Sequence, residues 1–260
     1  MTTVMVDRGG GIPLRSAAGG CGLLVSVRDA AEAAEALAGG ATIVDVKEPA
    51  RGALGVATAA VTARIAAVVG DRAAWTLAGG ELRDGVETIH DHVRRTLALE
   101  EPGSLPPVAA KAGLAGAAGA DWRAWLAAFA AGLPAGIAPV AVAYADWERA
   151  GSPPPPDVIA AAVAVGCGVL LLDTFDKAGP GVIDPPGAVA DVTAWVARAR
   201  AAGLGVVLGG RLTPDSLPAA VTCGVDVIAV RSAACVGGRS GTVCRKAVQR
   251  LGKLCGPAGF

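Results

Sequence analysis

Short apolar runs alternate with longer, alanine-rich segments along almost the whole chain. Successive runs start 20 to 36 residues apart, which is the size of a βα unit. Because strands of parallel sheets are buried on both faces, their sequences are nearly all apolar, as these runs are. The pattern therefore predicts eight parallel strands, at residues 22–27, 42–47, 73–78, 108–111, 139–144, 169–173, 205–208 and 226–231.

The segments between and after these runs have the length and composition of helices. Several end on a glycine immediately before the next run, as at Gly70 and Gly203. Glycine tolerates the left-handed conformation that closes a helix. Thr213 before Pro214 is expected to cap the seventh helix. The predicted helices are 28–38, 58–69, 86–99, 121–131, 157–165, 187–202, 214–222 and 242–254.

Eight βα units in about 240 residues predict an α/β fold, a (β/α)8 TIM barrel. We expect one catalytic domain at residues 21–260, preceded by a flexible tail at residues 1–20. The alternative is an open, doubly wound sheet, which usually carries a G-x-G-x-x-G turn after its first strand. The first turn here, at residues 26–29, has no such motif. The barrel is therefore favoured.

Composition and charge exclude several functional classes. Hydrophobic residues make up 53% of the 260 positions, enough apolar surface to exclude a disordered chain. The 23 Lys and Arg balance the 23 Asp and Glu, so the basic excess typical of nucleic-acid-binding proteins is lacking. No apolar run reaches the roughly 18 residues needed to span a bilayer. We expect neither a nucleic-acid nor a membrane partner.

The N-terminus and the cysteines indicate a compartment. Residues 1–20 lack the continuous apolar core of a signal peptide. The six cysteines form no C-x-x-C pair, which argues against a zinc site and fits reduced thiols. His90 and His92 lie on different faces of one predicted helix, so we expect them on the surface and without a shared metal. The sequence predicts a cytoplasmic protein with no metal site.

Candidate chemistry gathers where the predicted strands end, the catalytic end of a TIM barrel. Asp45 and Lys47 are two residues apart on one strand, so both side chains face the same side. Lys111 ends the fourth strand, and Asp173 and Lys177 follow the sixth. An apolar wall and neighbouring ammonium groups favour a neutral, nucleophilic amine. The cluster suits imine formation with a carbonyl substrate; the alternative for Asp45 and Lys47 is a purely structural buried ion pair.

A second feature lies after the last two strands, where TIM barrels frequently bind phosphate. Small residues there leave backbone N–H groups free for an anion, and two arginines supply positive charge. The alternative for the glycine pair is an ordinary tight turn. The candidate phosphate-binding residues are Gly209, Gly210, Arg231, Ser232, Ala233 and Arg239.

Taken together, these segments resemble the (5-formylfuran-3-yl)methyl phosphate synthase family, also called 4-hydroxymethyl-2-furancarboxaldehyde-phosphate synthase. The resemblance begins at Leu23 and runs to about Leu254. Residues 1–20 and 79–107 follow the family poorly. The segments that carry the resemblance are D-V-K-E-P at 45–49, G-A-L-G at 52–55, L-D-T-x-x-K at 172–177, and V-R-S-A-A-C-x-G-G at 230–238.

The resemblance implies a TIM-barrel lyase that condenses two glyceraldehyde 3-phosphate molecules into a phosphorylated furan aldehyde, with loss of phosphate and water. The product would serve the biosynthesis of methanofuran or its bacterial analogue, and no cofactor is implied. The Schiff-base lysine of the family corresponds to Lys47 and its acid/base lysine to Lys111. Asp45, Asp173 and Lys177 match its supporting positions.

Two other functions stay open at this point. One is another Schiff-base aldolase acting on a sugar phosphate, with the same barrel and lysine. The other is a non-catalytic barrel that binds a phosphorylated metabolite. Borohydride trapping with a triose phosphate separates a binding protein from an enzyme, and product analysis separates the two enzymes. A homo-oligomer is compatible with the sequence, which leaves the oligomeric state open.

Overall fold

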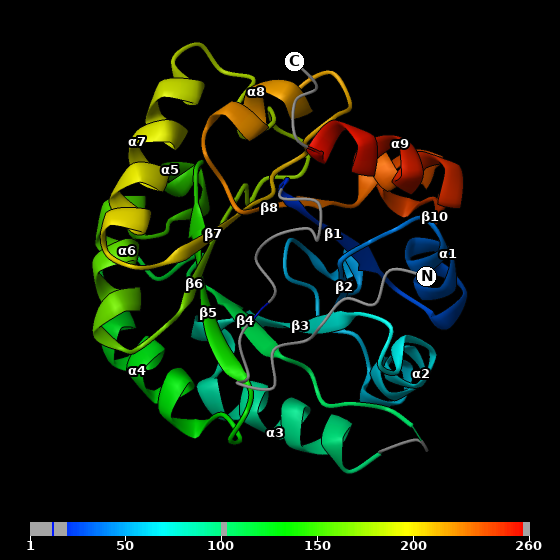
Figure 1. Cartoon of the computed structure of the whole chain (residues 1–260). Helices are drawn as coiled ribbons and strands as arrows, with labels where there is room; N and C mark the ends of the chain where they lie inside the picture. Colours follow the sequence, from blue (N-terminus) through cyan, green and yellow to red (C-terminus); the bar gives the residue numbers. More distant parts are fainter. Residues whose placement is uncertain (1–11, 13–19, 100–102, 257–260) are drawn as a thin grey trace.

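A computed structural model describes residues 12, 20–99 and 103–256, and the predicted tail at 1–20 lies almost wholly outside this part (Figure 1). Eight parallel strands pair in chain order, and the first pairs with the last to close a barrel. The predicted TIM barrel is confirmed. The strands are β1 (Gly22–Val27), β2 (Ile43–Val46), β3 (Ala74–Glu81), β4 (Ala109–Gly113), β5 (Ala138–Tyr144), β6 (Val169–Asp173), β7 (Gly205–Leu208) and β8 (Val227–Val230).

Helices surround the barrel, as Figure 1 shows. One predicted helix follows each strand, and a short additional helix, α5 (Trp147–Ala150), follows β5 before the predicted one. The outer helices are α1 (Ala30–Ala38), α2 (Ala59–Val69), α3 (Val86–Leu97), α4 (Trp122–Gly132), α6 (Pro155–Ala164), α7 (Ala188–Ala201), α8 (Leu217–Thr222) and α9 (Arg245–Cys255). No helix in the described ranges is long and apolar enough to cross a bilayer.

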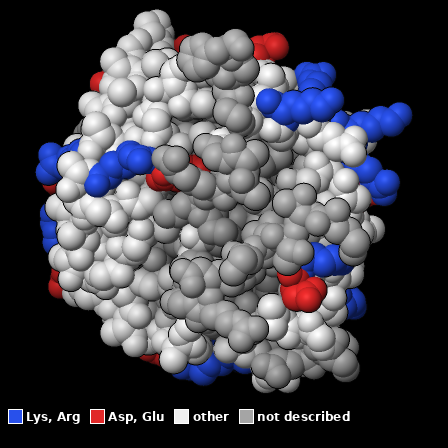
Figure 2. Space-filling model, in the orientation of Figure 1, with Lys and Arg blue, Asp and Glu red and all other residues white. Residues whose placement is uncertain are grey.

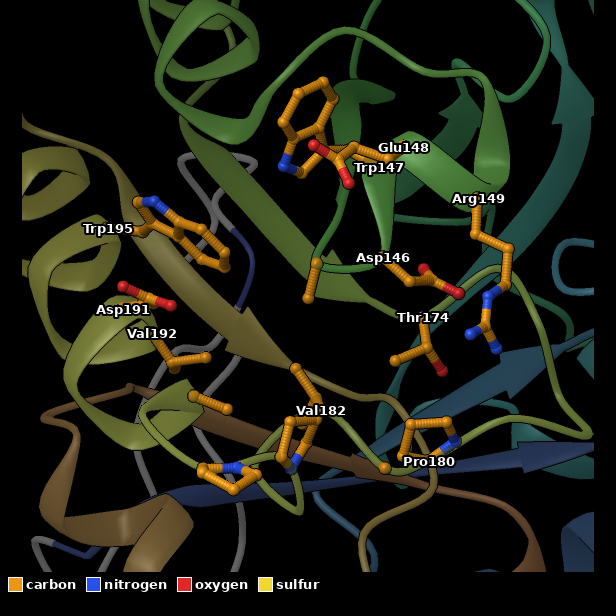
Figure 3. Close-up of a pocket in the computed structure, with 15 residues that line it drawn as sticks. Asp146, Trp147, Glu148, Arg149, Thr174, Pro180, Val182, Asp191, Val192 and Trp195 are labelled. Carbon is orange, nitrogen blue, oxygen red and sulfur yellow. The ribbon is translucent and has the colours of Figure 1, made fainter.

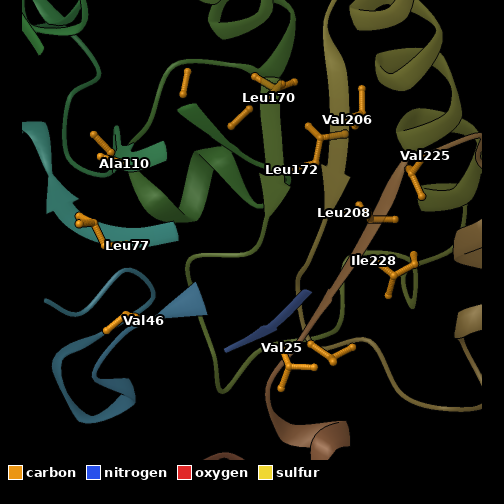
Figure 4. Packing of buried hydrophobic residues seen from close by; sticks show 14 of the residues in the cluster. Val25, Val46, Leu77, Ala110, Leu170, Leu172, Val206, Leu208, Val225 and Ile228 are labelled. Atoms are coloured by element: carbon orange, nitrogen blue, oxygen red, sulfur yellow. The ribbon is translucent and has the colours of Figure 1, made fainter. Parts of the chain in front are cut away.

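The strands bury both of their faces, in two separate cores. Successive side chains of a strand point to opposite sides. Leu170 and Leu172 of β6 join the core between strands and helices, which Figure 4 shows, whereas Leu171 joins the core inside the barrel. This double burial explains why the strand sequences are continuously apolar rather than alternating.

Two predicted helix starts are wrong. Thr213 and Ser216 exchange hydrogen bonds between side chain and backbone, so these residues form a turn and α8 begins only at Leu217. The helix predicted at 242–254 begins at Arg245, because Thr242–Val243 (β10) pairs with Cys235–Val236 (β9) in a small antiparallel hairpin. In both places a local polar or strand contact displaces the helix that periodicity predicts.

The surface position predicted for His90 is also wrong. Its side chain is buried between α3 and α4, where Nε2 lies 3.1 Å from the carbonyl oxygen of Phe129 and the two rings stack. Gly132 makes room for the imidazole, because a Cβ there would overlap it. His92 is half-buried on the same helix. The basic side chains on the face seen in Figure 2 form separate groups rather than one patch.

A buried ion pair links the elements around β1 and β8, the two strands whose pairing closes the barrel. Arg231, after β8, donates hydrogen bonds from Nη1 and Nη2 to the two carboxylate oxygens of Glu32 in α1. Its remaining N–H groups donate to the carbonyl oxygens of Ser26, Arg239 and Gly241 at 2.9–3.1 Å. All five guanidinium donors are therefore used within the protein, and they join β1, α1 and the loop after β8.

Glu32→Ala should lower the free energy of unfolding by about 3–5 kcal/mol, because it leaves a buried guanidinium without its counter-charge. Glu35→Ala is the matched control: Glu35 is on the same helix and pairs with Arg245 at 3.0 Å, but at the surface. It should lower the free energy of unfolding much less, because solvent screens an exposed ion pair. Urea denaturation measures both, and equal losses would contradict the assigned role of the buried pair.

Candidate active site

One side of the barrel mouth is organised around the carboxylate of Asp45. It accepts hydrogen bonds from the hydroxyls of Ser26 at 3.0 Å and Thr76 at 2.9 Å, and from the ammonium of Lys111. These partners come from β1, β3 and β4, and all four side chains are buried. Asp45, on β2, therefore holds Lys111 of β4 in the mouth, with β3 between the two strands.

The opposite side is organised around Asp173 at the end of β6. Its Oδ1 accepts a hydrogen bond from Lys177 Nζ at 2.7 Å and another from the backbone of Thr174 at 2.8 Å. Lys177 Nζ also donates to the carbonyl oxygen of Thr174. The second lysine is thus held by the strand end that precedes it.

Lys47 lies between these two pairs and has no ion-pair partner of its own among the described residues. Only 8% of the residue is exposed. Burial lowers the pKa of Lys47 from 10.5 to about 8; the charges of Asp173 and Asp45 oppose this, and those of Lys177 and Lys111 reinforce it. At pH 7 about a tenth of the amines are then neutral, against roughly one in 2,500 for a free lysine.

The two carboxylates stay ionised in spite of their burial. Burial alone would raise the pKa of Asp45, but Lys111 and Lys47 outweigh it and lower the pKa below its ordinary value. Burial likewise opposes ionisation of Asp173, and Lys177 and Lys47 again lower the pKa. Two fixed negative charges therefore flank a lysine that gives up its proton easily.

A cavity of about 330 Å³ joins this cluster to the loops after β7 and β8. Its lining brings together all five predicted catalytic residues and most of the predicted phosphate-binding ones. Ala233 does not line it; its side chain packs against the outer core. The charged and loop residues of the lining are Asp45, Lys47, Lys111, Asp173, Lys177, Gly209, Gly210, Arg211, Arg231, Ser232, Gly238 and Arg239.

Some of the predicted phosphate-binding residues already use their hydrogen-bond donors within the protein. Arg231 is buried, and all of its guanidinium N–H groups donate to protein oxygens, so its side chain has no donor free for an anion. Gly209 donates its N–H to the carbonyl oxygen of Leu172 at 2.8 Å. Gly210 has a φ of +95°, and a Cβ there would lie 2.8 Å from that of Val182, so only glycine fits.

Arg239 and Arg211 are the arginines of the lining that have no carboxylate partner in the described part of the chain. Arg239 Nη2 donates to the carbonyl oxygen of Gly52 at 2.8 Å. Arg211, which sequence reasoning missed, is the one described non-glycine residue with a positive φ, at +59°. Such a conformation is disfavoured for arginine, and strained residues cluster at functional sites. Its position after two glycines was the available signal.

Sequence reasoning also missed a buried acid beside the cluster. Glu81 ends β3, which extends beyond its predicted end, and accepts a hydrogen bond from Tyr144 Oη at 2.6 Å. Burial raises the pKa of Glu81, and burial together with the charge of Glu81 raises the pKa of Tyr144 well above 10. Neither residue lines the cavity. Glu81 also accepts the backbone N–H of Ala115 at 2.9 Å, so this pair joins the ends of β3, β4 and β5.

Within the described residues, no group of three or more His, Cys, Asp or Glu side chains could hold a metal ion. The mouth therefore presents amines and carboxylates beside two loops that carry Arg211 and Arg239. Its reactive group is a buried amine, which can attack a carbonyl carbon once it is neutral.

Fold and site together define a TIM-barrel enzyme whose candidate nucleophile is a lysine. Residues 23–252 match the model of the 4-HFC-P synthase family, and the chain belongs to this family. It is 31% identical to (5-formylfuran-3-yl)methyl phosphate synthase of Methanocaldococcus jannaschii, over 90% of this chain and 99% of that protein. The Methanothermobacter thermautotrophicus protein of that name is 31% identical over 89% and 98%.

A shorter match, to the protein of the same name from Methanobrevibacter smithii, is 35% identical and spans 45% of this chain and about half (49%) of that protein. Among solved structures, 3-hexulose-6-phosphate synthase has a TM-score of 0.57 at 16% identity, covering 90% of this chain and 99% of that one. Phosphoribosylanthranilate isomerase of Thermotoga maritima has a TM-score of 0.58 at 13% identity, covering 90% and 98%. These two likenesses show the barrel fold.

Asp173→Asn should lower the pKa of Lys47 below about 8, because Asp173 is the strongest of the charges that raise it. Reductive ¹³C-methylation of the lysines, followed by NMR titration, measures this pKa. Asp157→Asn, a change on the outer surface, should leave it where it is. An unchanged or raised pKa in Asp173→Asn would contradict the electrostatic arrangement described above.

Proposed function

We propose that this enzyme condenses two molecules of glyceraldehyde 3-phosphate into (5-formylfuran-3-yl)methyl phosphate through an imine on Lys47. The observation that carries the proposal is the buried amine of Lys47, with its pKa near 8, between two Asp–Lys pairs. Family membership supports the product, since the relatives carry the name of that activity. The product would serve the biosynthesis of methanofuran or its bacterial analogue.

The first step uses the neutral fraction of Lys47. Its nitrogen attacks the carbonyl carbon of one triose phosphate, and loss of water from the resulting carbinolamine leaves an imine. The protonated imine withdraws electrons from the adjacent C–H bond, which becomes acidic. Asp45 and Asp173, ionised on either side, stabilise this positive charge.

The later steps need a group that moves protons, and we assign this role to Lys111. Removal of the acidic proton gives an enamine, whose carbon attacks the aldehyde of the second triose phosphate. Ring closure through a hydroxyl oxygen and the eliminations that follow complete the furan. Two triose phosphates then equal one furan phosphate, one inorganic phosphate and two waters, so the sequence needs no external oxidant or reductant.

Phosphate recognition is assigned to the loops after β7 and β8. The backbone N–H groups of Gly210 and Ser232 and the guanidinium groups of Arg211 and Arg239 are the donors there. Charge-assisted hydrogen bonds from arginine suit a phosphate dianion. We call this the inner anion site.

Borohydride added with glyceraldehyde 3-phosphate should attach a stable mass to the peptide that contains Lys47. Lys47→Arg should abolish turnover although it keeps the charge, because guanidinium stays protonated. Lys253→Arg, on the exposed side of α9, is the control and should retain full activity. Product is followed by mass and by the ultraviolet absorbance of the furan aldehyde; a label on Lys111 or Lys177 instead would refute the assignment.

Lys111→Ala should slow product formation about 10²–10⁴-fold, the usual contribution of a positioned acid/base group. Imine trapping at Lys47 should persist in this variant, which separates proton transfer from covalent attachment. Single-turnover assays of trapping and of furan formation measure the two steps. Near-normal turnover would reduce Lys111 to a charge partner of Asp45.

A further inference from the structure

A further cavity, of about 450 Å³, adjoins the active-site cavity and shares Lys177 and Arg239 with it. We call it the vestibule. It lies between the loop after β2 and the loop after β6, which start on opposite sides of the barrel. Its lining consists of Pro49, Ala50, Gly52, Ala53, Arg149, Phe175, Asp176, Lys177 and Arg239.

The vestibule carries more positive than negative charge. Arg149, Lys177 and Arg239 line it, against the single carboxylate of Asp176. Arg149 pairs with Asp176 at 2.9 Å and Lys177 pairs with Asp173, whereas Arg239 has no carboxylate partner among the described residues. An anion placed here would meet one uncompensated guanidinium and the remaining donors of another.

The cations are held by loops that are themselves fixed. Both carboxylate oxygens of Asp146 accept backbone N–H groups of the loop after β6, from Phe175 at 2.7 Å and from Asp176 at 2.9 Å. Asp176 in turn accepts from Arg149. Binding of an anion would therefore require little reorganisation of these groups.

Arg149 lines the vestibule and also a further cavity on its other side. That cavity, of about 310 Å³, lies between α5 and α7 and contains Trp147 and Trp195. Figure 3 shows Arg149 beside Asp146 and Thr174, on the far side of this cavity from Trp195. Its guanidinium reaches the loop after β6, where Nη1 bonds to Asp176.

We propose that the vestibule is a second anion site, which binds the phosphate of the triose phosphate that is not attached to Lys47. The inference rests on the proposed function. Two phosphate dianions must be present together when the carbon–carbon bond forms, and they repel each other unless separate cations hold them. The inner anion site holds one. Arg149 holds the other, and Arg239 and Lys177 lie between the two cavities, since both residues line both of them.

Binding stoichiometry tests the site without using activity. Isothermal titration with inorganic phosphate should find two phosphates per chain in the unchanged protein and one in Arg149→Gln. Arg123→Gln, an exposed arginine on α4 that pairs with Asp157, is the control and should keep two. One phosphate in the unchanged protein, or two in Arg149→Gln, would overturn the proposal.

Kinetic measurements then distinguish direct binding of the anion by Arg149 from an effect of Arg149 on the loop after β6. Arg149→Gln should raise the glyceraldehyde 3-phosphate concentration for half-maximal furan formation about tenfold, the loss expected for one charged hydrogen bond. Imine trapping at Lys47 should be unaffected. Asp176→Asn removes the carboxylate that competes with an anion for the guanidinium of Arg149, so it should lower that concentration. An equal rise in both variants would show that Arg149 acts only through the loop.

The two proposals fail in different ways. If the unchanged protein forms no furan phosphate but binds two phosphates, of which Arg149→Gln loses one, the proposed function is wrong and the anion site stands. If furan phosphate forms while Arg149→Gln matches the unchanged protein in both assays, the second anion site is wrong and the function stands.

Discussion

The burial of two lysines and two aspartates in one barrel mouth, beside the half-buried Lys177, is the constraint on which the site depends. Lys111 and Lys177 each bond to a carboxylate, and Lys47 has none to itself. If all five groups are ionised, the cluster carries one excess positive charge in a water-poor space. That charge can be reduced by loss of the proton on Lys47 or offset by an anion. Nucleophilicity and attraction of phosphate thus have one electrostatic origin.

This arrangement lowers the stability of the folded chain. The displacement of the Lys47 pKa from 10.5 to about 8 corresponds to about 3 kcal/mol. Because the folded protein holds this proton less tightly than the unfolded chain, the destabilisation is fully present below about pH 8. It disappears as the pH rises from about 8 to 10.5. Elsewhere in the fold, the burial of apolar side chains on both faces of the eight barrel strands and the Arg231–Glu32 pair oppose it.

Sequence periodicity predicted the barrel and the place of Lys47, Lys111 and Asp173, since residues at strand ends are fixed by local spacing and by the closure of the sheet. It could not predict partners that are distant in sequence. Arg231 looked available because Glu32 lies 199 residues away in α1. Glu81 was missed because β3 continues through two glycines that resemble a turn. The positive φ of Arg211 could not be predicted from the sequence, in which the two preceding glycines are the one indication of an unusual turn.

Chemistry and recognition come from different parts of this barrel. Asp45, Lys111 and Asp173 are on strands, and Lys47 and Lys177 follow strand ends, so the sheet positions these groups. The cations assigned to phosphate, Arg149, Arg211 and Arg239, come from segments after β5, β7 and β8. Loops tolerate substitution that strands do not. Substrate preference can therefore change through these arginines while the electrostatic environment that activates Lys47 is retained.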